Sequence, residues 1–281
     1  MLIVQKKRRR LLATNNDGKI FMYSNDNLII DGKEFRSRLF IGTGKHKSLE
    51  DLENYITSSE SEMITVAIRR LDLDDNQSND LLSFLIEKKL NILPNTAGCK
   101  NIDEIILTCE LSRELINTNW VKLEAIKDPK YLLPDPMMTI IAAEKLIKNG
   151  FKVLPYINSD PALAKNLEEI GCSTVMPLAS PIGSGNGIKN EESIRIIIEQ
   201  SNVPVIVDAG LAVPSDASKM MEIGADAVLV NTAIAQARDS KKMGEAFKLG
   251  VKAGRISFRS GRIPIKGIAS PSSPENNLLD V

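Results

Sequence analysis

Histidine is almost absent from this chain of 281 residues, because His46 is the only one. A site built from several histidines is therefore excluded, and a Ser-His-Asp triad would have one possible base. Cysteine is also scarce: Cys99, Cys109 and Cys172 lie far apart, and none belongs to a CxxC pair. Three separated cysteines predict neither a disulfide framework nor a zinc site, and they favour a reducing compartment.

Net charge is lacking as well, since 36 basic residues balance 36 acidic ones. This balance removes the main electrostatic argument for a nucleic-acid or membrane-surface partner. No apolar run is long enough to span a bilayer. The composition, 43% hydrophobic and 26% charged, is typical of a soluble globular protein with one large core. We therefore expect no nucleic acid and no membrane as partners, and a location in the cytoplasm or a plastid.

Strand-like runs alternate with amphipathic helical stretches between about residues 38 and 260, at the spacing of βαβ units. The expected strands are Leu39–Gly42, Met63–Ile68, Asn91–Pro94, Trp120–Ile126, Lys152–Ile157, Ser173–Pro177, Pro204–Asp208 and Ala227–Val230. Eight strands, each followed by a helix, predict an α/β fold of the (β/α)8 TIM-barrel type. No GxGxxG motif follows the first run, which argues against an open doubly wound sheet.

The two ends of the chain differ from this pattern. Residues 1–26 begin with a basic run, Gln5–Arg10, and continue as a polar stretch, whereas residues 265–281 are rich in Pro, Ser and Asn. We interpret both as flexible tails on a single barrel domain, residues 27–264. Two alternatives stay open for the first tail: it is a targeting or partner-binding segment, or translation begins at Met22.

The most informative local feature is a lysine and a glutamate two residues apart in an apolar run. Lys122 and Glu124 lie within Trp120–Ile126, where alternate side chains of a strand would share one face. Parallel strands in α/β proteins are covered on both faces, so this pair indicates a functional pocket. The alternative is a partly exposed pair worth about 0 to 1 kcal/mol.

Polar and glycine residues collect where a barrel would bring the ends of its strands together. Asp208 follows the apolar run Val205–Val207, and glycines occupy the loops nearby. Glycine lets backbone N–H groups approach an anion closely, and the loops after the last barrel strands frequently bind phosphate. We therefore predict a phosphate site formed by Gly183, Ala209, Gly210, Asn231 and Thr232.

Several of these residues also have a simpler interpretation. The loop Gly183–Gly187 could be a flexible connection or a lid, and Asp208 could cap the next helix. Cys99 fits a small buried hydrophobe better than a nucleophile. We interpret His46 as a loop residue without a catalytic role, and we place Asp226, which precedes its strand, at the opposite end of the barrel.

Several segments together carry a family resemblance. They are FRSRLFIGTGK (35–45), TVAIRR (65–70), LPNTAGC (93–99), VKLEAI (121–126), LLPDP (132–136), VLPYINSDP (153–161), VMPLASPIGSGNGI (175–188), PVIVDAGLAVPSDA (204–217) and ADAVLVNTAIAQARD (225–239). In these segments the chain resembles the thiazole synthases of thiamine biosynthesis, over roughly residues 28–264.

The resemblance implies a (β/α)8 enzyme, a sulfur-incorporating transferase that forms the phosphorylated thiazole carboxylate of thiamine. Its substrates would be 1-deoxy-D-xylulose 5-phosphate, dehydroglycine and a sulfur carrier protein with a C-terminal thiocarboxylate. Lys122 matches the family's Schiff-base lysine, Glu124 and Asp208 its acid/base carboxylates, and the five phosphate-site residues its sugar-phosphate contacts. The resemblance also implies a homo-oligomer, a tetramer. The residues require no metal and no organic cofactor.

The chain departs from the family pattern at three places. Gly210-Leu211-Ala212-Val213 stands where Gly-Ile-Gly-Thr is expected, His46 where tyrosine is common, and Ala125 where a larger aliphatic residue is. None of these changes removes a catalytic residue. Two rival functions stay open: an aldolase that uses a Schiff base on a sugar phosphate, and a noncatalytic barrel that binds the sulfur carrier protein.

The reactivity of the lysine depends on two opposing effects. Burial of Lys122 would lower its pKa and favour the nucleophilic amine, whereas the charge of Glu124 would raise it. The sequence does not decide which effect is larger.

Overall fold

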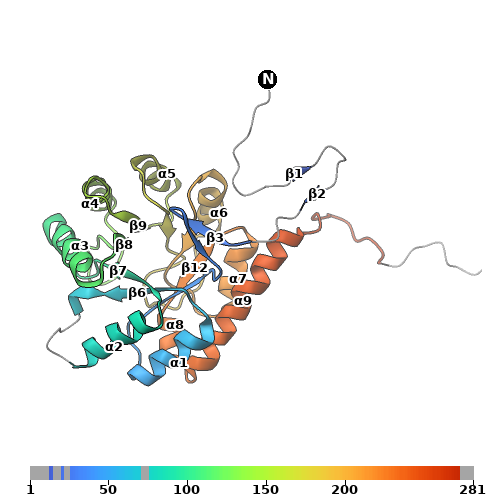
Figure 1. Cartoon of the computed structure of the whole chain (residues 1–281). Helices are drawn as coiled ribbons and strands as arrows, with labels where there is room; N and C mark the ends of the chain where they lie inside the picture. The colour runs from blue at the N-terminus through green and yellow to red at the C-terminus, as the bar shows by residue number, and fades with distance from the viewer. Residues whose placement is uncertain (1–12, 15–19, 22–25, 71–75, 273–281) are drawn as a thin grey trace, which may run out of the picture.

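Eight parallel strands form a central sheet with helices around it (Figure 1). The computed structural model describes residues 13–14, 20–21, 26–70 and 76–272. The strands of this sheet are β5 (Leu39–Gly42), β6 (Met63–Ala67), β7 (Asn91–Asn95), β8 (Trp120–Leu123), β9 (Lys152–Ile157), β10 (Met176–Pro177), β11 (Ile206–Val207) and β12 (Ala227–Val230).

The sheet closes on itself. Its strand order is β10-β9-β8-β7-β6-β5-β12-β11, and parallel bridges Val175–Val205 and Leu178–Asp208 join the two outer strands. The predicted (β/α)8 barrel is therefore confirmed. Strands β10 and β11 are shorter than expected, and their pairing continues only as the isolated bridges Val175–Val205 and Leu178–Asp208.

Helices follow the strands around the ring. They are α1 (Leu49–Ser59), α2 (Asn76–Glu87), α3 (Ile102–Ile116), α4 (Pro136–Lys148), α5 (Pro161–Ile170), α6 (Glu191–Gln200), α7 (Pro214–Glu222), α8 (Thr232–Ala235) and α9 (Ser240–Ser260), with a short 3₁₀ turn at Ile68–Arg70. Their starts follow from local sequence: Asp135 and Asp160 accept hydrogen bonds from first-turn amides and are each followed by proline. Gly171 ends α5 in the left-handed conformation, as expected for a glycine after a helix.

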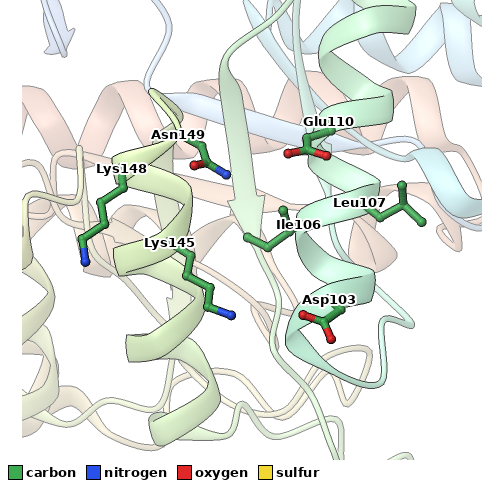
Figure 2. Close-up of a pocket in the computed structure, with 7 residues that line it drawn as sticks. All are labelled: Asp103, Ile106, Leu107, Glu110, Lys145, Lys148 and Asn149. Carbon is green, nitrogen blue, oxygen red and sulfur yellow. The ribbon is translucent and has the colours of Figure 1, made fainter.

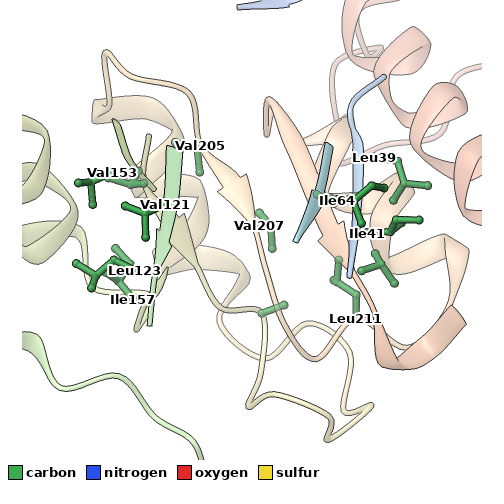
Figure 3. Close-up of a cluster of buried hydrophobic side chains, with 14 of the residues drawn as sticks. Leu39, Ile41, Ile64, Val121, Leu123, Val153, Ile157, Val205, Val207 and Leu211 are labelled. Carbon is green, nitrogen blue, oxygen red and sulfur yellow. The ribbon is translucent and has the colours of Figure 1, made fainter. Parts of the chain in front are cut away.

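The alternation of side chains along the strands separates two apolar layers. Val121 and Leu123 of β8 point outward and join the large cluster between sheet and helices, with equivalents on the other strands (Figure 3). Inward residues such as Phe40 and Leu154 form a second cluster inside the barrel. Lys122 therefore belongs to the inward face, as the sequence predicts.

An antiparallel hairpin that the sequence analysis did not identify closes the amino-terminal end of the barrel. Strands β3 (Leu28–Ile30) and β4 (Lys33–Phe35) are joined by Asp31 and Gly32, which have positive φ angles of 46° and 79°. Leu28, Ile30 and Phe35 are buried in the inner cluster, and the Phe35 ring contacts Trp120, the first residue of β8. The barrel interior is therefore filled at this end.

The proposed tails are described only in part. A second short antiparallel pair, β1 (Ala13–Thr14) and β2 (Ile20–Phe21), lies inside the range 1–26, and most of that range lies outside the described residues. Residues 262–272 contain no helix or strand, and residues 273–281 are not described. The interpretation of both ends as flexible tails stays a prediction.

Truncating the hairpin's aromatic residue should destabilise the fold. Phe35 is 1% exposed, so Phe35→Ala should lower the free energy of unfolding by about 3 to 5 kcal/mol through lost burial and the cavity left behind. Urea denaturation measures this change. The matched control is Ile29→Ala, on the same hairpin but 55% exposed, which should change stability by less than about 0.5 kcal/mol. Equal effects would show that the hairpin does not seal the core.

Candidate active site

The barrel brings a lysine and two carboxylates together from distant parts of the sequence. Lys122 Nζ lies 2.6 Å from Asp208 Oδ2 and 3.3 Å from Glu124 Oε1, and the exposed fractions of the three side chains are only 5%, 3% and 7%. Lys122 is on β8, Glu124 lies one residue beyond that strand, and Asp208 follows β11. The alternative of an exposed, solvent-screened pair is therefore wrong.

The balance of burial and charge leaves Lys122 as an ammonium. Burial alone would lower the pKa of Lys122, but the charges of Asp208 and Glu124 and their hydrogen bonds outweigh it and raise this pKa above its ordinary value. At Lys122, the effect of the nearby carboxylates on the pKa is therefore larger than the effect of burial. A nucleophilic amine at this position requires the loss of a proton to a nearby group.

Hydrogen bonds hold the backbone of Glu124 and the carboxylate of Asp208 in place. Thr96 Oγ1 accepts a hydrogen bond from the Glu124 amide at 2.8 Å, and its hydroxyl donates to the Glu124 carbonyl at 3.0 Å. The Ala209 amide donates to Asp208 Oδ1 at 2.7 Å, which leaves Oδ2 directed at Lys122. Thr96 lies within the segment LPNTAGC (93–99), but nothing in the sequence assigned it this role.

Tyr156, on β9, is a site residue that the sequence analysis did not identify. It is fully buried, its ring centroid lies 5.7 Å from Lys122 Nζ, and its hydroxyl donates to the Leu132 carbonyl at 3.4 Å. Burial, together with the charges of Asp208 and Glu124, raises the pKa of Tyr156. The phenol therefore stays neutral and presents an aromatic face to the cation.

A cavity of about 1520 Å³ lies above the lysine at the carboxyl ends of the strands. Its lining includes Lys122, Glu124 and Asp208 together with all five residues of the predicted phosphate site: Gly183, Ala209, Gly210, Asn231 and Thr232. Sites for one small molecule usually span about 300 to 1,000 Å³. This cavity therefore has room for more than one reactant.

The predicted phosphate loops meet in one part of the cavity. Gly183 has a φ angle of +71°, and a Cβ built on it would lie 3.9 Å from Thr232 Oγ1, so the loop after β10 reaches the start of α8. Gly210 is packed against Ser180: a Cβ there would lie 1.9 Å from the Ser180 hydroxyl and 2.6 Å from its carbonyl oxygen. Ala209 also has a positive φ angle, 55°, which is uncommon for a residue with a side chain.

The fit of Gly210 gives a stability prediction. Gly210→Ala should lower the free energy of unfolding by about 3 kcal/mol, because it adds a clash with backbone to a φ angle of +74°. The matched control is Gly185→Ala, with φ +59° but nothing within 4 Å of the added carbon, which should cost about 1 kcal/mol. Urea denaturation distinguishes the two, and equal losses would contradict the close packing.

A smaller groove on the outer surface contains none of these residues. It measures about 430 Å³, lies between α3 and α4 and is lined by charged and apolar side chains of both helices, including Asp103, Glu110, Lys145 and Lys148 (Figure 2). It is separated from Lys122 by the sheet and the outer apolar layer. The chemistry therefore belongs to the larger cavity.

The other residues singled out from the sequence lie where they were expected. Cys99, Cys109 and Cys172 are free and buried, and burial raises the pKa of Cys109 and of Cys172 to about 12. Asp226 accepts a hydrogen bond from the Val205 amide at the amino end of the barrel.

Across residues 26–70 and 76–272, no group of three or more His, Cys, Asp or Glu side chains is placed to hold a metal ion, and no helix is suited to cross a bilayer.

Comparison with known proteins agrees with this geometry. The family model described as thiazole biosynthesis protein ThiG matches residues 29–274. The chain belongs to the ThiG family. Its activity is therefore the enzymatic formation of thiazole in thiamine biosynthesis, which confirms the resemblance found in the sequence.

Individual relatives of this ThiG-family chain cover nearly all of it. A thiazole synthase of Prochlorococcus marinus (strain MIT 9215) is 56% identical over 263 residues, covering 92% of this chain and 99% of that protein. A thiazole synthase of Thermosynechococcus vestitus is 54% identical over 258 residues, 90% of this chain and 93% of that protein. BexX, solved in a complex with CysO from Amycolatopsis orientalis, is similar in structure: TM-score 0.76, 30% identity, and coverage of 86% of this chain and 98% of that one.

Proposed function

We propose that Lys122 forms a Schiff base with 1-deoxy-D-xylulose 5-phosphate as the first covalent step of thiazole formation. The observation that carries this proposal is the buried Nζ, 2.6 Å from Asp208 Oδ2 and 3.3 Å from Glu124 Oε1, at the base of a large open cavity. A buried lysine beside acid/base groups is suited to attack a ketone carbon.

The charge balance of this step fits the site. The Lys122 ammonium gives a proton to Asp208 or Glu124, the free amine attacks the ketone, and the proton returns as water leaves. Ammonium plus ketone thus become iminium plus water, and one positive charge stays at the same nitrogen. The two carboxylates that stabilise the ammonium therefore also stabilise the iminium.

The iminium acts as an electron sink for the neighbouring carbon of the sugar. Loss of a proton from that carbon to Glu124 or Asp208, and its return elsewhere, moves the carbonyl function along the chain. A carbon of the sugar then becomes open to attack by sulfur. Condensation with dehydroglycine, loss of water and ring closure release Lys122.

The anionic end of the sugar is held by the predicted phosphate loops. Gly183, Ala209, Gly210, Asn231 and Thr232 line the cavity. Gly183 and Gly210 have positive φ angles and no side chain, so their backbone can approach an anion closely.

The sulfur donor in this proposal is a sulfur carrier protein with a C-terminal thiocarboxylate. The size of the cavity supports a second, extended reactant, and the similarity to BexX, solved together with the second protein CysO, supports a protein partner. We further propose that the enzyme works as a homo-oligomer, a tetramer, in the cytoplasm or a plastid.

Borohydride reduction tests the covalent step. The protein incubated with 1-deoxy-D-xylulose 5-phosphate and reduced should gain the mass of the sugar phosphate on the peptide that contains Lys122. No adduct at Lys122 would overturn the proposal and favour a noncatalytic carrier-binding barrel. An adduct accompanied by carbon–carbon cleavage of the sugar without any sulfur donor would instead indicate an aldolase.

A further inference from the structure

The loop after β5 places an uncompensated cation beside the predicted phosphate loops. Lys45 is exposed and lines the cavity, and a Cβ built on Gly183 would lie 3.4 Å from its Nζ and 3.9 Å from Thr232 Oγ1. Within the described stretches of the chain, Lys45 has no hydrogen-bond or ion-pair partner. Its ammonium therefore lies between two of the loops that were assigned to the substrate's phosphate.

The other lysines along the cavity differ from Lys45. Lys122 is paired with Asp208 and Glu124, Lys127 with Asp135 at 2.9 Å, and Lys47 donates to the Ala237 carbonyl at 2.8 Å. Lys100 is on the loop after β7, away from the loops that follow β10, β11 and β12. Lys45 is thus the lysine positioned for the anion.

The backbone of this loop is held in an unusual conformation. Lys45 has a φ angle of +67°, a region that residues with a side chain adopt at an energetic cost. His46 Nδ1 donates to the Thr43 carbonyl at 2.5 Å, which closes the turn around Lys45. Gly42 and Gly44 pack on Asn231, since a Cβ at either would lie about 3 Å from its side chain.

These contacts fix the backbone position from which the Lys45 side chain extends. The turn cannot move away from Asn231 without losing this packing, and Asn231 itself precedes Thr232 at the start of α8. Strain that the surrounding structure maintains is a common feature of ligand-binding positions. Here the strained residue is Lys45, whose Nζ lies beside Gly183.

We infer that Lys45 is a substrate-binding residue that supplies the positive charge for the phosphate of the sugar. This inference rests on the proposed function and adds a residue to it. A phosphomonoester carries a charge of about −1.5 to −2 near pH 7. The five residues assigned to the phosphate are neutral, so backbone dipoles alone would have to balance that charge. One charge-assisted hydrogen bond from Lys45 would complete the site.

The test compares Lys45→Met with the parent and with Lys100→Met, which removes the same charge elsewhere on the rim. Lys45→Met should raise the concentration of 1-deoxy-D-xylulose 5-phosphate needed for half-maximal borohydride trapping at Lys122 by about 10- to 100-fold. Lys100→Met should change it by less than about threefold. Lys45→Arg should restore most of the affinity, because arginine keeps the charge.

A second measurement, with a sugar that has no phosphate, distinguishes phosphate binding by Lys45 from other roles of this residue. Trapping of unphosphorylated 1-deoxy-D-xylulose should be the same in Lys45→Met and the parent, because this sugar has no anion to hold. Unchanged half-saturation with the phosphorylated sugar, or an equal loss with both sugars, would overturn the inference.

Failure of the proposed function would look different. Calorimetric titration with inorganic phosphate does not depend on imine formation. A parent enzyme that forms no adduct, together with weaker phosphate binding in Lys45→Met, would reject the Schiff base and retain Lys45 as the anion ligand. Unchanged phosphate binding in Lys45→Met would reject Lys45 whatever happens at Lys122.

Discussion

Lys122→Arg should abolish borohydride labelling by 1-deoxy-D-xylulose 5-phosphate and lower the rate of thiazole formation by more than about 10³-fold. Arginine stays charged at every working pH and cannot act as an amine nucleophile. It still presents a cation to Asp208 and Glu124, so the buried carboxylates keep a partner and the fold should be retained. Mass spectrometry of the reduced protein and a thiazole assay measure the two effects.

The matched control for this variant is Lys152→Arg. Lys152 is on the neighbouring strand β9 and pairs with Asp31 of the hairpin turn at 2.7 Å, at the amino-terminal end of the barrel. After borohydride reduction with the sugar phosphate, the Lys152→Arg variant should carry the adduct at Lys122 to the same extent as the parent enzyme. Labelling of Lys122→Arg at the parental level would show that another residue is the nucleophile.

Asp208→Asn should separate imine formation from the later proton transfers. The amide side chain has nearly the same shape and can keep the hydrogen bond from the Ala209 amide, but it has no charge and is not a base. We expect overall turnover to fall by about 10²- to 10⁴-fold, the usual contribution of a general acid or base. The measurement is steady-state thiazole formation alongside the trapping rate.

The pH dependence gives this variant a second, independent readout. The charge of Asp208 is one of the effects that raise the pKa of Lys122, whereas burial lowers it. The trapping rate of the parent should rise with pH, because the reactive amine forms as Lys122 loses its proton. Without Asp208 that pKa falls, so the rise should move to lower pH.

Asp226→Asn is the control for the loss of an aspartate at the opposite end of the barrel. Asp226 lies at the amino end, where its carboxylate accepts the Val205 amide. This variant should keep the parental pH profile and lose less than about threefold in turnover per folded molecule. An Asp208→Asn profile that coincides with the parent's would contradict the role given to Asp208.

Much of the barrel could be predicted because its strands are short apolar runs bounded by clear signals. Val121 and Leu123 alternate with Lys122, and this period of two is enough to assign the lysine to the inward face. Gly171, which ends α5 in the left-handed conformation, is another signal that can be read locally. These are local patterns, which a sequence shows directly.

The hairpin β3–β4, which closes the barrel, could not be predicted from the sequence. Asp31-Gly32 is a recognised turn signal, but each flanking strand has only three residues, too few for an alternating pattern to be recognised. Its neighbours are first residues of distant strands, such as Trp120. Such contacts depend on closure of the whole sheet.

The chemistry of the site was only partly predictable for the same reason. The sequence indicated that Lys122 and Asp208 end near one another, but the 2.6 Å contact between strands far apart in sequence decides the protonation of the lysine. Tyr156 looked like an ordinary strand residue. Its contact with Lys122 Nζ follows from the register of β8 and β9, in which Lys122 is paired with Leu154, two residues before Tyr156.

The hairpin β3–β4 also has a kinetic consequence. Leu28, Ile30 and Phe35 close the amino-terminal end of the barrel, so reactants reach Lys122 from the opposite rim. The reactant that binds closest to Lys122 must therefore enter first. In the function proposed above, the sugar phosphate would bind at Lys122 before the C-terminal tail of the sulfur carrier protein enters above it. An excess of the tail should therefore slow sugar entry, so the enzyme should follow a compulsory order of addition.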